Sequence, residues 1–285
     1  MITQINLSIR HAHENDRNEL ASLIQLEPYV HRHLDWRPPL DWLGHQPYLV
    51  LQQKDQLVAA LACPPDPPKV AWIRTFAAAS TVATTRAWEL LWSEVRAEFE
   101  GNSDISVAAI PLYNWFRKIL ERSAFSHAHD VVLLARERKP LPPEGRAHSA
   151  KIRGMTAEDL PAVAEVDHAA FRPLWQNSLE TLRLAYDQAA CATVAVDEHS
   201  VVGYQLSTPS PHGWHLARLA VHPRRQRQGI AFDLTRSLLG YFLERGTDQI
   251  SVNTQDDNTA SLLLYEKAGF YRTGEEYPVY RYDFT

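Results

Sequence analysis

The sequence predicts two α+β domains in one chain, each built from a mixed, mostly antiparallel sheet flanked by helices. Three observations predict this fold class. The 285 residues are about twice the length of a common domain. Of these residues 45% are hydrophobic and 22% charged, which is typical of a protein that buries a core. Finally, the expected elements of the first half recur in the same order in the second half.

Composition excludes several partner classes. The 29 Lys and Arg residues against 34 Asp and Glu residues give a formal net charge of −5, which argues against binding to nucleic acid. The chain shows no basic start followed by an apolar stretch, and no apolar run near the roughly 18 residues of a membrane span. The two cysteines, Cys63 and Cys191, predict a reducing compartment. We therefore expect a cytoplasmic protein, monomer or homodimer, without a membrane partner.

The clearest boundary is the stretch Arg136–Arg146, where three prolines, a glycine and dense charge follow an apolar run. Such a composition is typical of a linker. It predicts one domain over residues 1–137, a linker over 138–150 and a second domain over 151–285.

Four matched pairs carry the repeat between the two halves. Their offsets are 143 (152 − 9), 144 (201 − 57), 145 (250 − 105) and 145 (269 − 124), a drift of two positions. The pairs are Ile9-Arg10 with Ile152-Arg153, Leu57–Ala60 with Val201–Tyr204, Ile105–Val107 with Ile250–Val252, and Ala124-Phe125 with Gly269-Phe270. The halves therefore share one architecture.

The second half begins its sheet with a hairpin, Cys191–Val196 and Ser200–Leu206, around the turn Asp197–His199. In the next strand, Trp214–Val221, the apolar positions change phase around Ala217-Arg218, which predicts a bulge that leaves backbone donors unpaired.

After this strand the pattern becomes helical over Ala231–Arg245, where Gly246 ends the helix. A strand at Ile250–Val252 follows, then a helix with Asn258 as its N-cap and Gly269 at its end. We expect Val279–Phe284 to close the sheet of the second domain.

The loop Val221–Ala231 joins a strand directly to a helix, whose first N–H groups and positive dipole end form an anion site. Gly229 allows a ligand to approach the backbone, although a glycine in an arginine-rich loop also occurs as a simple turn. One glycine fits neither a P-loop nor a dinucleotide fingerprint. Between His199 and Phe232 there are four arginines and no carboxylate: Arg218, Arg224, Arg225 and Arg227.

Two spaced motifs carry a family resemblance. The pattern Gln226-x-x-Gly229-x-Ala231, followed by Asn258-x-Ala260 and by Tyr265-x-x-x-Gly269-Phe270, resembles the GNAT superfamily of acyl-CoA-dependent N-acyltransferases. The loop Ala170–Trp175 is similar to the acceptor-side loop of ribosomal-protein alanine N-acetyltransferases. The tandem layout resembles that of mycothiol synthases, whose C-terminal unit is the active one. The motifs cover residues 150–285, whereas residues 1–135 resemble the superfamily in shape only.

The resemblance implies a direct acetyl transfer from acetyl-CoA to a primary amine of a peptide or small molecule, without a metal. Tyr265 would protonate the departing thiolate, although its position also suits core packing. Asn258 would contact the pantetheine arm, although helix capping alone explains it as well. The residues implied in cofactor binding are Leu219, Ala220, Val221, Gln226, Arg227, Gln228, Gly229, Ile230, Ala231 and Asn258.

One position departs from the ribosomal-protein group, in which a glutamate five residues before the motif asparagine is the general base. Here that residue is Asn253, which cannot accept a proton. A water chain, His215, Asp256 or Asp257 would then assist, or the amine would arrive neutral, and we favour water. The competing hypothesis is a non-catalytic CoA-binding or protein-interaction module.

The first half lacks the corresponding chemistry. Aligned at the repeat offsets, Gly229 falls on Thr85, Tyr265 on Leu120 and Asn258 on Tyr113. We therefore expect residues 1–137 to form a degenerate GNAT-like domain. The pairs His31/His33 and His127/His129 show no third metal ligand nearby, so we expect them at the surface.

Overall fold

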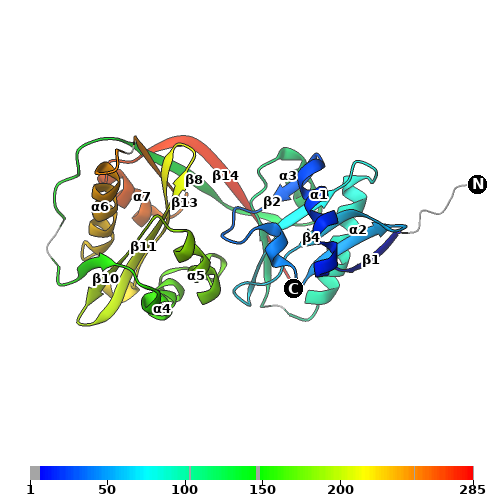
Figure 1. The fold of residues 1–285 in the computed structure, drawn as a ribbon, viewed down its shortest axis with the longest axis horizontal. Coiled ribbons are helices and arrows are strands. Elements are labelled where there is room, and N and C mark those ends of the chain that lie inside the picture. Colours follow the sequence, from blue (N-terminus) through cyan, green and yellow to red (C-terminus); the bar gives the residue numbers. More distant parts are fainter. Residues whose placement is uncertain (1–6, 103, 146–147, 247, 285) are drawn as a thin grey trace, which may run out of the picture. The chain divides into compact units, whose positions relative to one another are not determined.

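The computed structural model describes residues 7–102, 104–145, 148–246 and 248–284 (Figure 1). The chain forms two compact units: a first unit of Met1–Ala128 with Pro278–Thr285, and a second unit of His129–Tyr277. Both contain mostly antiparallel sheets flanked by helices, so the predicted α+β class is confirmed.

The first unit contains a five-stranded antiparallel sheet in the order β1-β3-β4-β6-β2. Its elements are β1 (Leu7–His11), α1 (Arg17–Leu26), β2 (Tyr29–Arg32), β3 (Tyr48–Gln53), β4 (Gln56–Ala62), β5 (Val70–Trp72), β6 (Thr75–Ala78), α2 (Thr84–Phe99), β7 (Ser106–Ala109), α3 (Asn114–Arg122) and the start of β8 (Ser126–Glu137). Its core is rich in aromatic rings, and the Phe76 ring packs edge-on against Trp88 at 5.2 Å.

Strand β2 is the distinctive element of the first unit. Pro28 favours the end of α1, and the chain then runs extended alongside β6, with Arg32 opposite Thr75 and Tyr29 opposite Ala78. His31 on β2 is 1% exposed, stacks on Phe116 and hydrogen-bonds the Ile73 carbonyl through Nε2. The expected surface position of His31 is therefore wrong: although β2 is an edge strand of the sheet, the His31 side chain is buried against Phe116.

The second unit orders its strands β9-β10-β11-β12-β13-β8-β14, and β12 runs parallel to β13. Helices α6 and α7 share one core with Leu216 and Val252, while α4 packs against β11 and β12 (Figure 1). The elements are β9 (Lys151–Gly154), α4 (Leu160–Ala170), α5 (Leu179–Gln188), β10 (Cys191–Asp197), β11 (Ser200–Ser210), β12 (Gly213–Val221), α6 (Ile230–Leu243), β13 (Gln249–Gln255), α7 (Thr259–Lys267) and β14 (Tyr271–Asp283).

Each unit takes a strand from the other half of the sequence. In the second unit, Val131–Glu137 of β8 pair antiparallel with Gln249–Gln255 of β13. In the first unit, the end of β14 pairs with β7, so that Tyr280 lies opposite Ala109. The expectation that Val279–Phe284 closes the second sheet is therefore wrong, since long-range strand pairing places this segment in the first unit.

The predicted linker, residues 138–150, lies within the second unit and packs along α6 where the structure describes it. Arg236 donates to the Pro142 carbonyl at 3.0 Å, and His148 Nε2 lies 2.8 Å from an Asp233 carboxylate oxygen. Prolines suit this stretch because a proline has no backbone N–H to donate, and the contact with α6 uses a proline carbonyl as acceptor. The compact units consequently divide at 128/129 and 277/278 instead of across residues 138–150.

Candidate active site

The predicted bulge in β12 is present. Leu206 of β11 pairs with Arg218 and Ser207 pairs with Leu216, which leaves Ala217 without an opposite residue. On its other side, β12 pairs with β13 only over Trp214–Leu216. The bulge therefore lies where the parallel strands β12 and β13 separate.

The hydrogen bonds of β12 show which backbone donors face that opening. His222 N–H donates to the Val202 carbonyl of β11 at 2.9 Å. Because N–H groups alternate in direction along a strand, those of Leu219 and Val221 point away from β11, toward the edge that β13 leaves. Ala220, directly opposite Tyr204, presents its N–H to β11 instead. Of the three β12 residues predicted to bind the cofactor, Leu219 and Val221 therefore have backbone N–H groups that are not directed at β11, whereas Ala220 does not.

The loop that follows leads into α6 in a conformation suited to an anion. Gly229 is the N-cap residue with φ 98°, and Arg227 also has positive φ, 60°. The first N–H groups of α6 have no acceptor within the helix. Gln226 and Arg227 are exposed, and Gln226 Nε2 donates to the Val221 carbonyl at 3.0 Å.

Side chains of the predicted loop residues divide between surface and core. Ile230 is 1% exposed and packs beside Leu234, whereas Gln228 and Ala231 are half-buried. The group that this loop presents to a ligand is therefore mainly its backbone.

The four arginines do not form a single positive cluster. Arg225 binds the Asp197 carboxylate and donates to Ser149 Oγ at 3.0 Å. Arg218 pairs with buried Asp167. Only Arg224 and Arg227, both exposed, lie beside the loop without a carboxylate contact in the described structure. The segment from His199 to Phe232 holds four arginines and no carboxylate, but it does not present four free charges, because Asp167 and Asp197 outside the segment neutralise two of them.

Asp167 and Arg218 form a buried network beneath the bulge. The Asp167 carboxylate is fully buried, with its Oδ2 accepting from Arg218 Nε at 2.8 Å and Nη2 at 2.6 Å, and from the Tyr204 hydroxyl. Sequence reasoning missed Asp167, although its place beside Val163 and Val166 on the inner face of α4 was a usable signal.

This network also holds the predicted acceptor-side loop. Arg218 donates to the Trp175 carbonyl, and its guanidinium lies 3.6 Å from the centre of the Phe171 ring. On the far side, Arg172 lies 3.4 Å from Asp257, and the Trp175 ring is 5.4 Å from His129. The loop therefore contacts both the β12 side and the β13 side of the opening.

Helix α7 places the two remaining predicted residues. Asn258 is the N-cap, and its side-chain oxygen accepts from Ser261 N–H at 3.2 Å. Tyr265 is 5% exposed in the core with Leu216 and Val252. Burial raises the pKa of the Tyr265 phenol, so the group is protonated at pH 7.

Asn253 occupies the open part of β13, one residue beyond the last β12–β13 pair. Its side chain hydrogen-bonds His215, and His215 Nδ1 also lies 2.9 Å from Ser251 Oγ. The structure thus brings Asn253, which replaces the expected glutamate, next to His215, one of the alternative bases.

The corresponding edge of the first unit is occupied. Ala79 N–H donates to the Val58 carbonyl as His222 donates to Val202, so β6 corresponds to the end of β12. Strand β2 pairs along the whole of β6 and takes the position that is open beside Leu219 and Val221.

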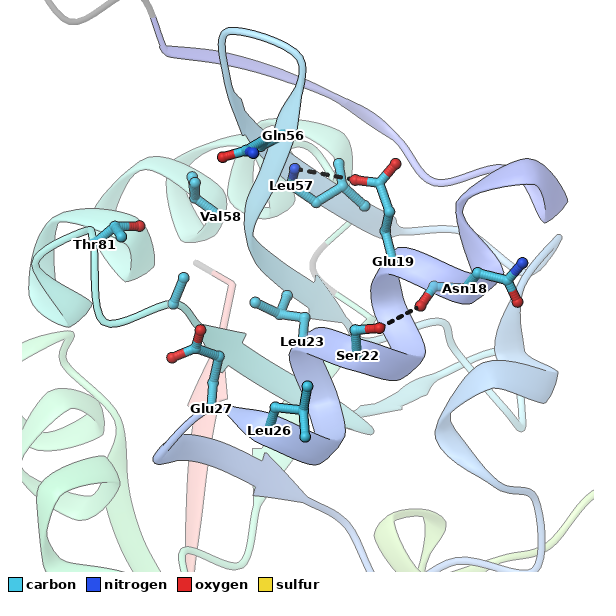
Figure 2. A pocket seen from close by; sticks show the side chains of 11 residues that line it. Asn18, Glu19, Ser22, Leu23, Leu26, Glu27, Gln56, Leu57, Val58 and Thr81 are labelled. Carbon is cyan, nitrogen blue, oxygen red and sulfur yellow. Dashed lines mark hydrogen bonds between the residues drawn. The ribbon is translucent and has the colours of Figure 1, made fainter.

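A surface pocket of the first unit lies elsewhere, between α1, β4 and the loop after β6. Figure 2 shows Leu23 and Leu26 beside Leu57 and Val58, with Glu19 and Glu27 at the sides. Both carboxylates already accept backbone N–H groups, from Leu57 and Ser80 respectively.

Among the described residues, no three His, Cys, Asp or Glu side chains converge as ligands of a metal ion would. No described helix combines the length and the apolar character that crossing a membrane requires.

Comparisons with known proteins agree with this geometry. Residues 160–270 match the model of the acetyltransferase (GNAT) family. N-alpha-acetyltransferase 30 of Schizosaccharomyces pombe is 32% identical over 92 residues, 30% of this chain and 61% of that protein. Human N-acetyltransferase 8 is 28% identical over 97 residues, 32% of this chain and 43% of that protein. The chain therefore spans less than two thirds of either relative.

Solved structures share the fold over the whole chain. A GCN5-related N-acetyltransferase from Sphaerobacter thermophilus matches with 17% identity and a TM-score of 0.60, covering 97% of this chain and 95% of that one. A tandem GNAT protein from the clavulanic acid biosynthesis pathway matches with 13% identity and a TM-score of 0.63, covering 98% of both. These likenesses support the tandem layout.

Proposed function

We propose, from the match of residues 160–270 to the acetyltransferase (GNAT) family model, that the second unit transfers an acetyl group from acetyl-CoA directly to a primary amine. The observation that carries the proposal is the open edge of β12, where the Leu219 and Val221 donors lie next to the start of α6. The edge of β12 and the adjacent start of α6 thus offer backbone N–H donors for a thioester carbonyl and for a diphosphate.

The chain's own groups would divide the work. Backbone N–H groups of the Gln226–Ala231 loop would bind the pyrophosphate, and the Leu219 and Val221 donors would stabilise the oxyanion. Asn258 would contact the pantetheine arm through the side of its amide that does not cap α7. Tyr265, kept protonated by burial, would donate a proton to the leaving thiolate.

The first unit supports the assignment by contrast. Its equivalent edge is bonded to β2, and it lacks the loop glycine and the tyrosine. We propose that it is a degenerate unit that binds no acyl-CoA, and that the chain turns over one cofactor at a time.

The acceptor class follows from the same site. A peptide N-terminus and a small-molecule amine both fit the proposal, because the charged groups at the acceptor-side loop are engaged within the chain: Arg218 donates to the Trp175 carbonyl, and Arg172 pairs with Asp257. A panel of peptide and small-molecule amines, with release of free CoA as the signal, would identify the acceptor.

A glycine pair at the two ends of α6 provides a sharp test of the cofactor site. Gly229 and Gly246 both have positive φ, 98° and 72°, so alanine strains either backbone similarly. We expect Gly229→Ala to weaken acetyl-CoA binding at least tenfold by calorimetry, and Gly246→Ala to leave it unchanged. Equal affinities, or no binding by the unaltered chain, would refute the proposal.

A further inference from the structure

We propose that His215 is the base that takes the proton from the acceptor amine, with Ser251 fixing its tautomer and Asn253 supporting its charged form. This inference rests on the proposed acetyl transfer. It replaces the missing glutamate with a side chain from the neighbouring strand.

The first argument is the placement of His215. Its neighbours Trp214 and Leu216 point toward α6, where the Trp214 ring stacks on Phe242 at 4.4 Å. Side chains alternate along a strand, so His215 points to the opposite face, the one that bears the acceptor-side loop. It lies one residue before the last β12–β13 pair, at the mouth of the opening.

The second argument is the hydrogen-bond pattern of the ring. Ser251 Oγ lies 3.4 Å from the Trp214 carbonyl oxygen and 2.9 Å from His215 Nδ1. In the proposed arrangement the serine proton points to that carbonyl, and the serine oxygen accepts from His215 Nδ1–H. A neutral imidazole with its proton on Nδ1 carries its lone pair on Nε2. The serine therefore leaves Nε2 as the atom that accepts a proton.

The third argument is the electrostatic surroundings. Burial lowers the pKa of His215, which keeps the ring neutral at pH 7, while the Asn253 hydrogen bond acts in the opposite direction by favouring the charged form. Two charged groups on the elements packed there, Asp167 of α4 and Arg218 of β12, pair with each other.

The two other candidate bases, on the loop after β13, are already engaged. Asp256 accepts from Asp130 N–H at 3.1 Å, and Asp257 lies 3.4 Å from Arg172.

The first unit provides an internal control. Its strand register places Val70 opposite Ser106, just as His215 lies opposite Ser251. Two residues after Ser106 stands Ala108, where the second unit has Asn253. The serine recurs, but the histidine and the asparagine are absent from the unit whose cofactor edge is closed.

The proposed step balances as follows. The neutral amine nitrogen forms a bond to the thioester carbon, and the carbonyl π electrons move to oxygen. His215 Nε2 accepts the proton from the resulting ammonium. The carbonyl re-forms as the C–S bond breaks, and the thiolate receives a proton from Tyr265. His215 then gives its proton to water, and Tyr265 regains a proton from water, so that both side chains return to their starting states.

The test compares His215→Ala with the unaltered chain and with His212→Ala, an exposed histidine in the turn before β12, using an acceptor from the amine panel. We expect His215→Ala to lower kcat about 10² to 10⁴-fold, as loss of a general base does, with acetyl-CoA affinity within twofold. Added imidazole should restore part of kcat in proportion to its free-base form. His212→Ala should match the unaltered chain.

An independent readout is the ¹⁵N spectrum of His215 at pH 7, which should show a protonated Nδ1 and an unprotonated Nε2. A kcat for His215→Ala within tenfold of the unaltered chain, or the opposite tautomer, overturns the assignment. If the unaltered chain binds acetyl-CoA but acetylates no amine, the proposed function fails and this inference fails with it. If His215→Ala still transfers acetyl groups at an undiminished rate, the assignment of His215 as the base is refuted, while the proposed acetyl transfer stands.

Discussion

Buried His31 makes the stability of the first unit depend on pH. Burial lowers its pKa to about 4 in the folded state, against roughly 6.5 in an unfolded chain. Above pH 6.5 the ring is neutral in both states and contributes no pH dependence. As the pH falls from 6.5 toward 4, the unfolded state binds a proton that the folded state excludes, so the free energy of unfolding decreases.

The size of the effect follows from the shift. One pKa unit corresponds to about 1.4 kcal/mol, so His31 removes about 2 kcal/mol between pH 7 and pH 5, and about 3 kcal/mol by pH 4. The variant His31→Leu keeps an apolar side chain against Phe116 and loses the titration. The pKa of His33 is lowered chiefly by burial, then by Arg74 and least by His31, so most of its pH dependence is common to both proteins.

The assay is urea unfolding of the full chain at pH 7 and pH 5, followed by tryptophan fluorescence. Six of the eight tryptophans lie before residue 128, so the signal reports chiefly on the first unit. The unaltered protein should lose about 2 kcal/mol more than His31→Leu over this pH interval. Equal losses in the two proteins would show that His31 titrates normally, and the burial argument would be refuted.

Three further predictions concern the second unit, each measured by urea unfolding. Asp167→Asn breaks a buried ion pair and should cost about 3 to 5 kcal/mol, whereas Asp257→Asn breaks an exposed one and should cost at most about 1 kcal/mol; similar costs would contradict the network. Asn258→Ala removes the cap of α7 and should cost about 1 kcal/mol, and an unchanged stability would show that capping contributes nothing. Gly269→Ala combines φ 89° with a guanidinium nitrogen 3.2 Å from the added Cβ, so it should cost more than Gly274→Ala, which has the same φ and open space.

Local sequence patterns determined much of the second unit. The phase change around Ala217 predicted the bulge, because a strand's side chains alternate and one extra residue reverses the alternation. The cap at Asn258 and the start of α6 after Gly229 follow from backbone groups within a few residues. Such features depend on neighbours in the chain, so they can be predicted without a tertiary structure.

Only the tertiary structure decided which groups meet across the sheet. Arg218 lies 51 positions from Asp167, and neither residue identifies the other in the sequence. His215 and Asn253 come together because β12 and β13 are parallel neighbours, a pairing made by a crossover through α6. The closing of the first unit's edge by β2, and the assignment of β8 and the end of β14 to units distant in sequence, likewise depend on strand pairing. Composition and periodicity specify that a strand forms, whereas hydrogen bonding between distant segments specifies its partner.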